Sequence, residues 1–402
     1  MKLRLKINLA YFKQVLFYSS IIFLPTQLNK YFFGEYALVN GVRKDLLAVQ
    51  LSLSLLIILL FISFYLKQIA SLAKKKQVLL FVFFSAVNLF FSINKVTTAY
   101  RLFLIYALIC YIFAVLQFKK EKLLNQRLLL ISLLFMLAPQ LFLAVYQFLA
   151  GKSFGSVFYF LGERALSLTG ADTALVYFYK ELRLRPYATF SHPNSMAGFM
   201  LMLVVFLLYK IKPETGFDSL LRVLSVLIAS GLVLISFSKT AILGLVLLLF
   251  VYFIKNLSCW FCFISRVIVL VIFSLVFLLT PFLSSSVAER LVYAGDSFLI
   301  LKTFFWFGSG LGGYLKALAN IFPERSTVFL QPVHNIFFLF LAETGFVGFL
   351  FVLLEFWLSK KTVFFFLKKN LPFVFIIGFL GLFDHYFLSL NQNLFSLIFI
   401  FL

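Results

Sequence analysis

Charged residues are scarce in this sequence, and their scarcity limits the class of protein that it encodes. Asp, Glu, Lys and Arg make up 12% of the 402 residues, whereas 63% are hydrophobic. A water-soluble domain of this length does not bury so much apolar surface in one core. Uncharged apolar runs such as residues 53–60 and 267–279 are typical of helices that cross about 30 Å of hydrocarbon. The composition therefore predicts an all-α, polytopic bundle of membrane helices.

Cysteine and histidine are also rare, with three residues of each. Cys110 stands alone, while Cys259 and Cys262 form a CxxC that has no second CxxC and no neighbouring histidine. No two histidines have the i, i+4 spacing with which one helix face binds zinc. The pattern argues against a metal site and against a redox motif. We expect the protein to use no metal and no other cofactor.

Acidic residues are few, so the formal net charge is +22. Lys and Arg gather in short segments between apolar runs, at residues 2–6, 74–76, 119–122, 210–212, 360–361 and 368–369. This placement is typical of cytoplasmic loops under the positive-inside rule, with some attraction to anionic lipid. It argues against nucleic-acid binding. The basic N-terminus lacks a small-residue cleavage site, so the first apolar run is predicted to remain in the membrane.

Hydropathy predicts about twelve transmembrane helices, with the N-terminus in the cytoplasm. The predicted spans are residues 15–31, 46–66, 78–91, 102–118, 128–149, 195–209, 220–236, 240–254, 267–282, 336–358, 371–387 and 394–402. Every lysine-rich segment then falls on the cytoplasmic side of a bacterial cytoplasmic (inner) membrane. Two long connections, residues 150–194 and 283–335, are extracytoplasmic, and their apolar content predicts short interfacial helices. We expect residues 1–402 to form one membrane domain.

Histidines concentrate at the predicted outer surface. His192, His334 and His385 all lie at outer ends of predicted spans, each beside other polar residues. For any one of them, an interfacial side chain that water or a carbonyl satisfies is an equally good interpretation. His334 is the strongest functional candidate, because it follows a long loop and directly precedes a span.

The two outer loops contain arginines, although the positive-inside rule concentrates cations on the other side. These are Arg164, Arg183, Arg185, Arg290 and Arg325. A guanidinium suits a diphosphate, because it makes two charge-assisted hydrogen bonds to phosphate and keeps its proton. The alternative is that some of these arginines pair with loop acids. Those acids are Glu163, Asp172, Glu181, Glu289 and Glu324. Lys239, at the outer start of a span, is a further cation on this side.

Glycines interrupt the second loop at Gly308, Gly310, Gly312 and Gly313. The stretch lacks the following Lys and Ser/Thr of a nucleotide P-loop, so it predicts a tight turn or a close approach of helices. Two more glycines, Gly345 and Gly348, stand beside Glu343 and indicate helix packing in the same way.

Several of these segments together resemble the O-antigen ligase and O-antigen polymerase superfamily. In order along the chain they are residues 24–28 (LPTQL), 185–194 (RPYATFSHPN), 236–240 (SFSKT), 308–312 (GSGLG), 334–335 (HN), 343–348 (ETGFVG) and 381–385 (GLFDH). No single motif is diagnostic, but their order and spacing on a matching topology are similar to that family over nearly the whole chain.

The resemblance implies a type-C glycosyltransferase, metal-independent, that transfers a glycan from undecaprenyl diphosphate to an acceptor hydroxyl at the outer face of the membrane. A histidine after the large outer loop is the family's proposed base, and the matching residue is His334. Arginines are thought to bind the diphosphate, and Arg185 and Arg290 occupy the corresponding stretches. The family often has Ser-Arg where this chain has Ser238-Lys239, which keeps the charge but loses the bidentate fork. The supporting positions are His192, Asn194, Asn335, Arg325 and His385.

Other functions stay open from the sequence. A polysaccharide polymerase or a protein O-oligosaccharyltransferase needs the same donor site, so lipid A core, protein and growing polymer all remain candidate acceptors. A transporter or flippase of lipid-linked glycans predicts ionisable residues near the bilayer midplane, where Glu343 is the best candidate. The polar residues gather at the outer surface instead, which favours the transferase. Its expected partners are the lipid-linked donor, a hydroxyl acceptor and membrane lipids.

Overall fold

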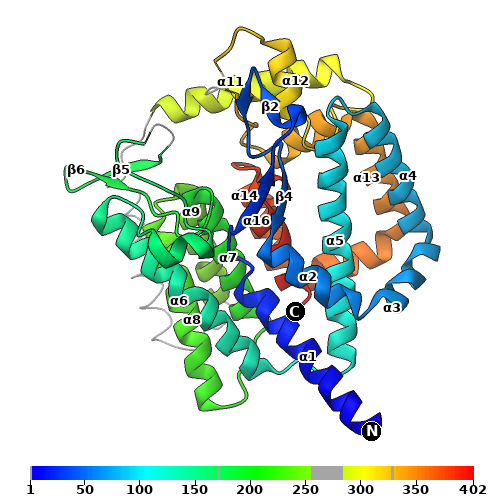
Figure 1. The fold of residues 1–402 in the computed structure, drawn as a ribbon, viewed down its shortest axis with the longest axis vertical. Helices are drawn as coiled ribbons and strands as arrows, with labels where there is room; N and C mark the ends of the chain where they lie inside the picture. Colours follow the sequence, from blue (N-terminus) through cyan, green and yellow to red (C-terminus); the bar gives the residue numbers. More distant parts are fainter. Residues whose placement is uncertain (1, 171–172, 255–283, 327–329) are drawn as a thin grey trace.

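The structure is a computed structural model that describes residues 2–170, 173–254, 284–326 and 330–402 (Figure 1). Helices make up most of the described residues, which confirms the predicted helical class. The α-helices are α1 (Lys2–Ile22), α2 (Leu53–Ser63), α3 (Leu66–Ala70), α4 (Lys76–Phe91), α5 (Lys95–Lys120), α6 (Gln126–Ala150), α7 (Pro193–Tyr209), α8 (Gly216–Ile235), α9 (Lys239–Ile254), α11 (Ser284–Thr303), α12 (Tyr314–Ile321), α13 (Ile336–Lys369), α14 (Leu371–Gly381), α15 (Tyr386–Ser389) and α16 (Asn391–Ser396). The 3-10 helices are η1 (Glu35–Ala37), η2 (Ser71–Lys74), η3 (Ser156–Leu161) and η5 (Leu397–Ile400).

Short β-strands form three two-stranded antiparallel sheets alongside these helices. The pairs are β1 (Asn29–Phe32) with β4 (Val49–Ser52), β2 (Leu38–Val39) with β3 (Val42–Arg43), and β5 (Leu175–Phe178) with β6 (Glu181–Leu184). The fold is therefore a helical bundle with small ribbons in its connections, and not purely α-helical.

Several helices of the described residues are long and apolar enough to cross a membrane. Four qualify by themselves, namely α5, α6, α8 and α13, and α2 with α3 makes a fifth if this pair, bent by 79°, is one broken span. The shorter apolar helices α4, α7, α9 and α14 pack against them. The chain is thus a multi-pass membrane protein. The predicted span 267–282 lies outside the described residues.

The first two predicted spans are wrong at the ends where they face each other. α1 ends at Ile22, and residues predicted to continue it form β1. The second span begins only at Leu53, because the residues before it form β4 and pair with β1. Ser52 caps α2 by accepting a hydrogen bond from Leu55 N. Hydropathy does not separate the end of a membrane helix from a short ribbon that contains apolar residues.

The two long connections fold differently from each other. Residues 283–335 contain α11 and α12, so the predicted helices are confirmed there. Among the described residues of 150–194, η3 is the helical segment, and the rest includes the hairpin β5–β6. Tyr179 and Lys180 form the hairpin turn with φ of 46° and 67°, the left-handed backbone that suits the twist of a two-residue hairpin. The prediction of interfacial helices is therefore wrong for most of this loop.

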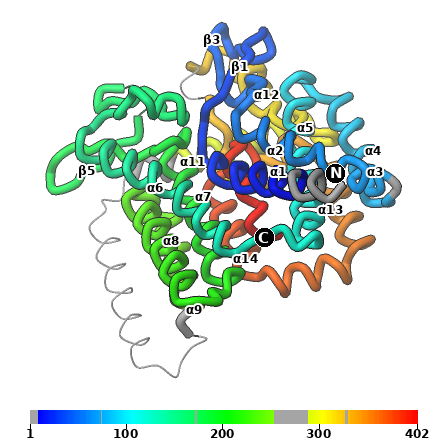
Figure 2. Tube along the Cα trace, turned by 60° about the horizontal axis from the view of Figure 1, so that its bottom comes forward, coloured from blue at the N-terminus to red at the C-terminus, as the bar shows by residue number. Residues whose placement is uncertain are grey.

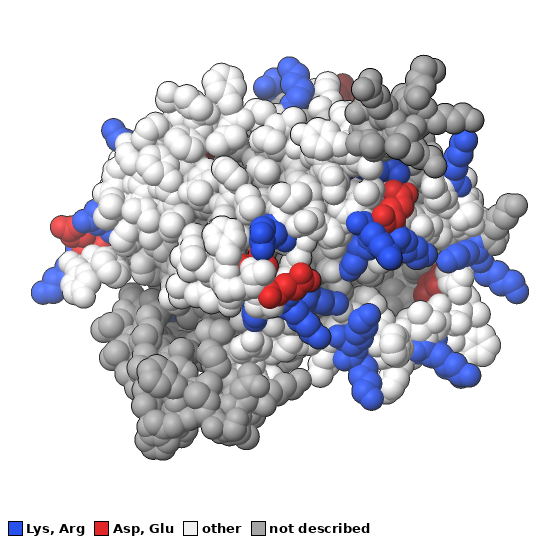
Figure 3. All heavy atoms as spheres, turned by 90° about the horizontal axis from the view of Figure 1, so that it is seen from below, with Lys and Arg blue, Asp and Glu red and all other residues white. Residues whose placement is uncertain are grey.

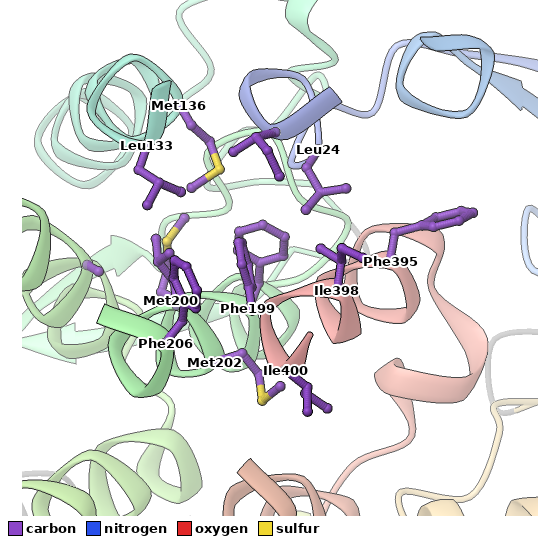
Figure 4. Close-up of a cluster of buried hydrophobic side chains, with 14 of the residues drawn as sticks. Leu24, Leu133, Met136, Phe199, Met200, Met202, Phe206, Phe395, Ile398 and Ile400 are labelled. Carbon is purple, nitrogen blue, oxygen red and sulfur yellow. The ribbon is translucent and has the colours of Figure 1, made fainter. Parts of the chain in front are cut away.

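The core surrounds α7, whose side chains are buried along most of its length. Phe199 and Phe206 pack on Phe399 of η5, and Figure 4 shows Leu133 and Met136 of α6 approaching α7 from the other side. The last predicted span, 394–402, is not one continuous helix. It forms α16 and η5, which lie between α7 and α5 (Figure 2).

Basic residues gather at one end of the bundle. Lys119 at the end of α5 donates to the carbonyl of Phe401 at 3.0 Å, and Lys210 after α7 donates to Asn370 Oδ1 at 2.7 Å. Lys369 is close enough to both lysines for their charges to interact. Figure 3 shows Lys and Arg spread over this lower end of the molecule. The opposite ends of α7, α13 and α14 carry the candidate site.

Candidate active site

Three helix ends meet where the sequence motifs predict a site. His192 caps the N-terminus of α7, because its Nδ1 accepts a hydrogen bond from Asn194 N at 3.1 Å. Asn335 caps α13 by accepting from Phe337 N and Phe338 N. The Asn335 side chain also donates to the carbonyl of Leu382 at 3.1 Å, just beyond the end of α14. This bond joins the start of α13 to the segment that carries Asp384 and His385.

Asp384 occupies the centre of this junction. Its Oδ2 accepts from Asn194 Nδ2 at 3.2 Å, and its Oδ1 accepts from the backbone of His385 at 2.8 Å. Burial favours the neutral acid, but the imidazoles of His334, His385 and His192 hold the pKa of Asp384 below its usual range. The side chain is therefore a carboxylate at neutral pH, with histidines around it.

His334 faces this carboxylate. Its Nδ1 lies 3.8 Å from Asp384 Oδ1, too far for a direct hydrogen bond, so the contact is electrostatic. Nδ1 is buried and has no hydrogen-bond partner among the described residues, yet 26% of the side chain is exposed. A carboxylate opposite Nδ1 favours the tautomer that carries the proton there. The unprotonated Nε2 is then the atom that can accept a proton from a substrate.

The other two histidines are held neutral. Burial, followed by the nearby Arg185 guanidinium, lowers the pKa of His192 to about 3. Burial also lowers the pKa of His385 to about 4, although Asp384 acts in the opposite direction. His385 Nδ1 lies 2.6 Å from Ser389 Oγ, and its ring centroid is 5.5 Å from that of His334. Both rings can line the site without adding positive charge to it.

Arg185 supplies a fixed cation beside the junction. Its Nη2 donates to Asn194 Oδ1 at 2.7 Å and its Nε donates to the carbonyl of Ser236 at 3.0 Å. Burial lowers the pKa of Arg185 to about 10, so it stays charged at neutral pH. Asn194 thus bridges the guanidinium and the carboxylate of Asp384. Lys239, at the start of α9, lies close enough to Arg185 for the two charges to repel each other.

The remaining predicted arginines are not at the junction. Arg290 makes no hydrogen bond or ion pair with another predicted site residue in the described part of the chain, although it is one helical turn from Tyr293 on α11. The Tyr293 ring lies 6.1 Å from that of His334. Arg325 binds Asp296 with both of its terminal nitrogens, at 2.5 and 3.2 Å, and covers the ring of Phe322. The Arg325 guanidinium is therefore paired with another side chain of the protein.

The other outer arginines have partners in the fold as well. Arg183 pairs with Glu181, one of the acids proposed for this role. Arg164 donates to the carbonyl of Ser191 at 3.1 Å. Glu163, by contrast, accepts from Gln147 and from the backbone of Phe154 and Gly155, so it is not an arginine partner.

His334, Asp384 and His385 also have a geometry that could hold a metal ion, since one ligand atom from each lies within 4.8 Å of the others. Helical spacing in the sequence does not reveal this group of possible ligands, because the three residues come from two segments that only the fold brings together. The absence of a His pair at i, i+4 is therefore not a sufficient reason to exclude a metal.

Asp384 and Ser389 are the members of the cluster that the sequence did not single out as site residues. Asp384 directly precedes His385. An acidic residue next to a histidine at the end of a predicted span could have indicated that Asp384 belongs to the site. Ser389 has no such signal, since a serine among apolar residues is common.

Behind Ser389, Arg101 of α5 donates a hydrogen bond to the Ser389 carbonyl at 2.6 Å. The adjoining pocket, about 30 Å³ in volume, includes Arg101, Ser389 and Glu343 among mostly apolar side chains and has room for little more than water.

The glycine motifs make the close backbone approach that the sequence predicts. Gly310 N donates to the carbonyl of Glu343 at 2.9 Å, and a Cβ on Gly308 would lie 2.3 Å from the Glu343 carbonyl carbon. The buried Glu343 carboxylate accepts from the backbone of Gly312 and Tyr314. These contacts give Glu343 a role in holding the loop. Because its carboxyl group is bound in this way, Glu343 is a weaker candidate for the ion site of a transporter.

The fold and this site together define a class of protein: a multi-pass helical membrane protein with a cluster of histidine, aspartate and arginine at the ends of its helices opposite a basic face. Residues 224–353 match the family model described as O-antigen ligase, which confirms the resemblance over that part of the chain. This family acts in the transfer of glycans at membranes. No curated protein matches the chain.

The matched region contains Lys239, Arg290, Arg325, His334 and Asn335. The other half of the cluster, at Arg185, His192, Asn194, Asp384 and His385, lies outside it. The site is therefore assembled from the matched region and from segments on both sides of it.

Proposed function

We propose that the protein transfers a glycan from undecaprenyl diphosphate to an acceptor hydroxyl at the outer face of the bacterial cytoplasmic membrane. One observation carries the proposal. His334 lies against the Asp384 carboxylate with Nδ1 buried, and Arg185 is bound through Asn194 to the same carboxylate. A candidate base therefore lies next to the carboxylate to which a fixed cation is linked through Asn194.

The reaction follows from these groups. The acceptor oxygen attacks the anomeric carbon and gives its proton to His334 Nε2, while Asp384 stabilises the imidazolium that forms. The bond between the anomeric carbon and the diphosphate oxygen breaks, and the diphosphate leaves with the electron pair. Arg185 opposes the negative charge that grows on it, with Lys239 nearby and Arg290 one turn along α11 from Tyr293. The N-termini of α7 and α13 also point toward the site and favour an anion there.

Replacement of the base tests this proposal. His334→Ala should lower the transfer rate by about 10² to 10⁴, the usual contribution of a general base, with little change in the amount of folded protein. The assay is the transfer of labelled glycan from the host's own lipid-linked donor in isolated membranes. His334→Gln, which keeps the size and polarity of the side chain, should be equally inactive.

A matched control separates the base from its surroundings. Tyr293→Phe keeps the ring that packs near His334 and should retain most activity. Full transfer by His334→Ala at normal protein levels would rule out the assignment. A wild-type rate that is lost with EDTA and restored by a divalent cation would assign His334, Asp384 and His385 to a metal instead.

The nature of the product distinguishes a ligase from a polymerase or a protein O-oligosaccharyltransferase. We favour ligation to a single acceptor, which predicts one new conjugate, whereas a ladder of products would mean polymerisation. Intact lipid-linked glycan crossing liposomes without a new bond would instead support a transporter. The engagement of Glu343 with its glycine loop argues against that last function.

A further inference from the structure

The ring of His385 is held by the hydroxyl of Ser389, four residues further along the chain. Ser389 Oγ lies 2.6 Å from His385 Nδ1 and donates to the His385 carbonyl at 3.1 Å. A carbonyl can only accept, and a hydroxyl has a single proton, so that proton points to the carbonyl. Nδ1 must therefore carry the ring proton and donate it to Oγ. The other ring nitrogen, Nε2, keeps a free lone pair.

The free lone pair belongs to a ring that lies beside the candidate base. The His385 ring centroid is 5.5 Å from that of His334, and a ring nitrogen of His385 lies within 4.8 Å of ligand atoms of His334 and Asp384. Within the described part of the chain, Nε2 makes no hydrogen bond and is not among the fully buried polar atoms that lack a partner. His385 thus offers a neutral hydrogen-bond acceptor to a molecule in the site.

A membrane helix holds Ser389 in place. Arg101 of α5 is buried and donates to the Ser389 carbonyl at 2.6 Å and to the Leu46 carbonyl at 2.9 Å. Asn391, two residues after Ser389, donates to the hydroxyl of Tyr100 on the same helix at 3.0 Å. These bonds fix the backbone of α15 against α5. The Ser389 hydroxyl therefore has a set position from which to orient the His385 ring.

A neutral acceptor selects among the groups of a sugar diphosphate. The lone pair of His385 Nε2 repels phosphate oxygens, which are negatively charged and carry no proton, but it suits a hydroxyl that can donate. Arg185, linked to Asp384 through Asn194, suits phosphate oxygens for the opposite reason. His385 and Arg185 are therefore suited to different parts of the substrate.

We propose that His385 Nε2 accepts a hydrogen bond from a sugar hydroxyl, next to the hydroxyl that His334 deprotonates, and that Ser389 is the positioning residue for this contact. The inference rests on the proposed function, which supplies the sugar. The proton stays on the bound hydroxyl, because His385 acts as an acceptor and no covalent bond changes at it. Donor and acceptor glycans both carry such hydroxyls, and kinetics separates the two sources.

The tautomer can be measured directly, because the chain has three histidines. Solid-state NMR of the full chain with isotope-labelled histidine in lipid bilayers separates protonated from unprotonated ring nitrogens, and His385→Phe identifies the signals of His385. They should show a proton on Nδ1 and none on Nε2 at neutral pH. In Ser389→Ala part of the proton population should move to Nε2. A proton on Nε2 in the wild type would overturn the proposal.

Two further variants separate the histidine contact from a general effect on the helix. Ser225 donates to the carbonyl of Leu221, four residues earlier, at 2.8 Å, as Ser389 does to that of His385. Ser225→Ala is thus a matched control and should leave all three imidazoles unchanged. Ser389→Thr keeps the hydroxyl and should retain the wild-type tautomer. A change in the His385 signals in Ser225→Ala as large as that in Ser389→Ala would contradict the role of Ser389.

Turnover tests whether the lone pair binds the substrate. Ser389→Ala should raise a KM about three- to tenfold, the effect of losing one hydrogen bond between neutral groups, with kcat nearly unchanged. The purified full chain receives the host's extracted lipid-linked glycan, with host membranes that lack the enzyme as the source of acceptor, and each is varied in turn. A higher KM for the donor assigns the hydroxyl to the donor sugar. A greater requirement for acceptor membranes assigns it to the acceptor.

A metal ion would compete for the same lone pair. Visible absorption bands from Co²⁺ bound to the wild-type chain, lost in His385→Phe, would assign Nε2 to a cation and overturn the proposal. The two proposals fail in distinguishable ways. If the wild type forms no glycan conjugate, the transfer reaction is wrong, whatever the tautomer of His385. If transfer is normal and Ser389→Ala moves the ring proton but changes neither KM, the hydroxyl contact is wrong and the reaction stands.

Discussion

The histidines illustrate how burial decides what an ionisable side chain can do. The sequence places His192, His334 and His385 at equivalent positions and gives no means to rank their basicity. Desolvation in the folded protein lowers the pKa of His192 to about 3 and the pKa of His385 to about 4. They are neutral throughout the physiological range and cannot exchange protons with a substrate near pH 7. His334 retains an exposed edge next to a carboxylate, as a base requires.

The two buried histidines predict a pH-dependent stability. Below pH 6.5 the unfolded chain protonates both rings, whereas the folded protein does not until about pH 4 or lower. The unfolded state then binds more protons, so the stability should fall as the pH falls through this window, by up to about 1.4 kcal/mol per pH unit for each histidine. Thermal unfolding of the purified protein in detergent over that range measures the slope.

His192→Asn is the variant for this test, because asparagine still accepts a hydrogen bond as a helix cap but does not titrate. It should reduce the slope without a large loss of stability at neutral pH. An identical slope in wild type and variant would mean that His192 is protonated in the folded protein.

At the scale of elements, the structure explains the presence of two glycine-rich motifs that are far apart in sequence, because the two motifs contact each other in the fold. Gly345 adopts a backbone conformation that side chains rarely tolerate, and Gly308 packs against it. A Cβ at Gly345 would lie 2.5 Å from Gly308 N. Through these contacts the elbow that Gly345 makes in α13 and the loop before α12 fix each other. The elbow in turn sets the direction of the part of α13 that follows it.

Gly345→Ala should therefore destabilise the protein by more than about 2 kcal/mol, because backbone strain and a steric clash act together. Gly378→Ala in α14 is a matched control, since a Cβ there meets no atom within 4 Å. It should be neutral, or should stabilise α14 by up to about 1 kcal/mol. Thermal unfolding compares the two variants, and equal melting temperatures would show that the elbow is not strained by a side chain.

For the whole molecule, the separation of polar groups implies an orientation in the membrane. The candidate site and the basic cluster lie at opposite ends of α7 and α13. The positive-inside rule then predicts that the basic end lies in the cytoplasm and the site outside, where the proposed reaction needs a polyprenyl carrier to present its glycan. The proposal depends on this orientation, since the lipid-linked donor is displayed on only one face.

Cysteine labelling tests the orientation. In a variant without Cys110, Cys259 and Cys262, Tyr179→Cys on the exposed β5–β6 turn should react with an impermeant maleimide in intact spheroplasts. Lys361→Cys on α13 should react only after permeabilisation. The reverse pattern would place the site in the cytoplasm and would remove the basis for the proposed reaction.

Most of the individual elements could be predicted from local sequence. The long apolar helices α5, α6, α8 and α13 follow from uncharged runs of sufficient length. The ribbons β1–β4 and β5–β6 were missed, because apolar strands and membrane helices have similar hydropathy over short segments. Of the site, His334, Arg185, Asn194 and His385 were identified from motifs, and the structure brings them together.

The sequence by itself determined the membrane class, the basic face and the residue types available for chemistry, because composition and hydropathy are properties of each segment alone. Only the tertiary structure decided that Asp384 is the partner of His334, that Arg325 is engaged with Asp296, and that His192 and His385 are neutral. Each of these depends on distance and burial between segments separated along the chain. Those quantities exist only after the helices have packed.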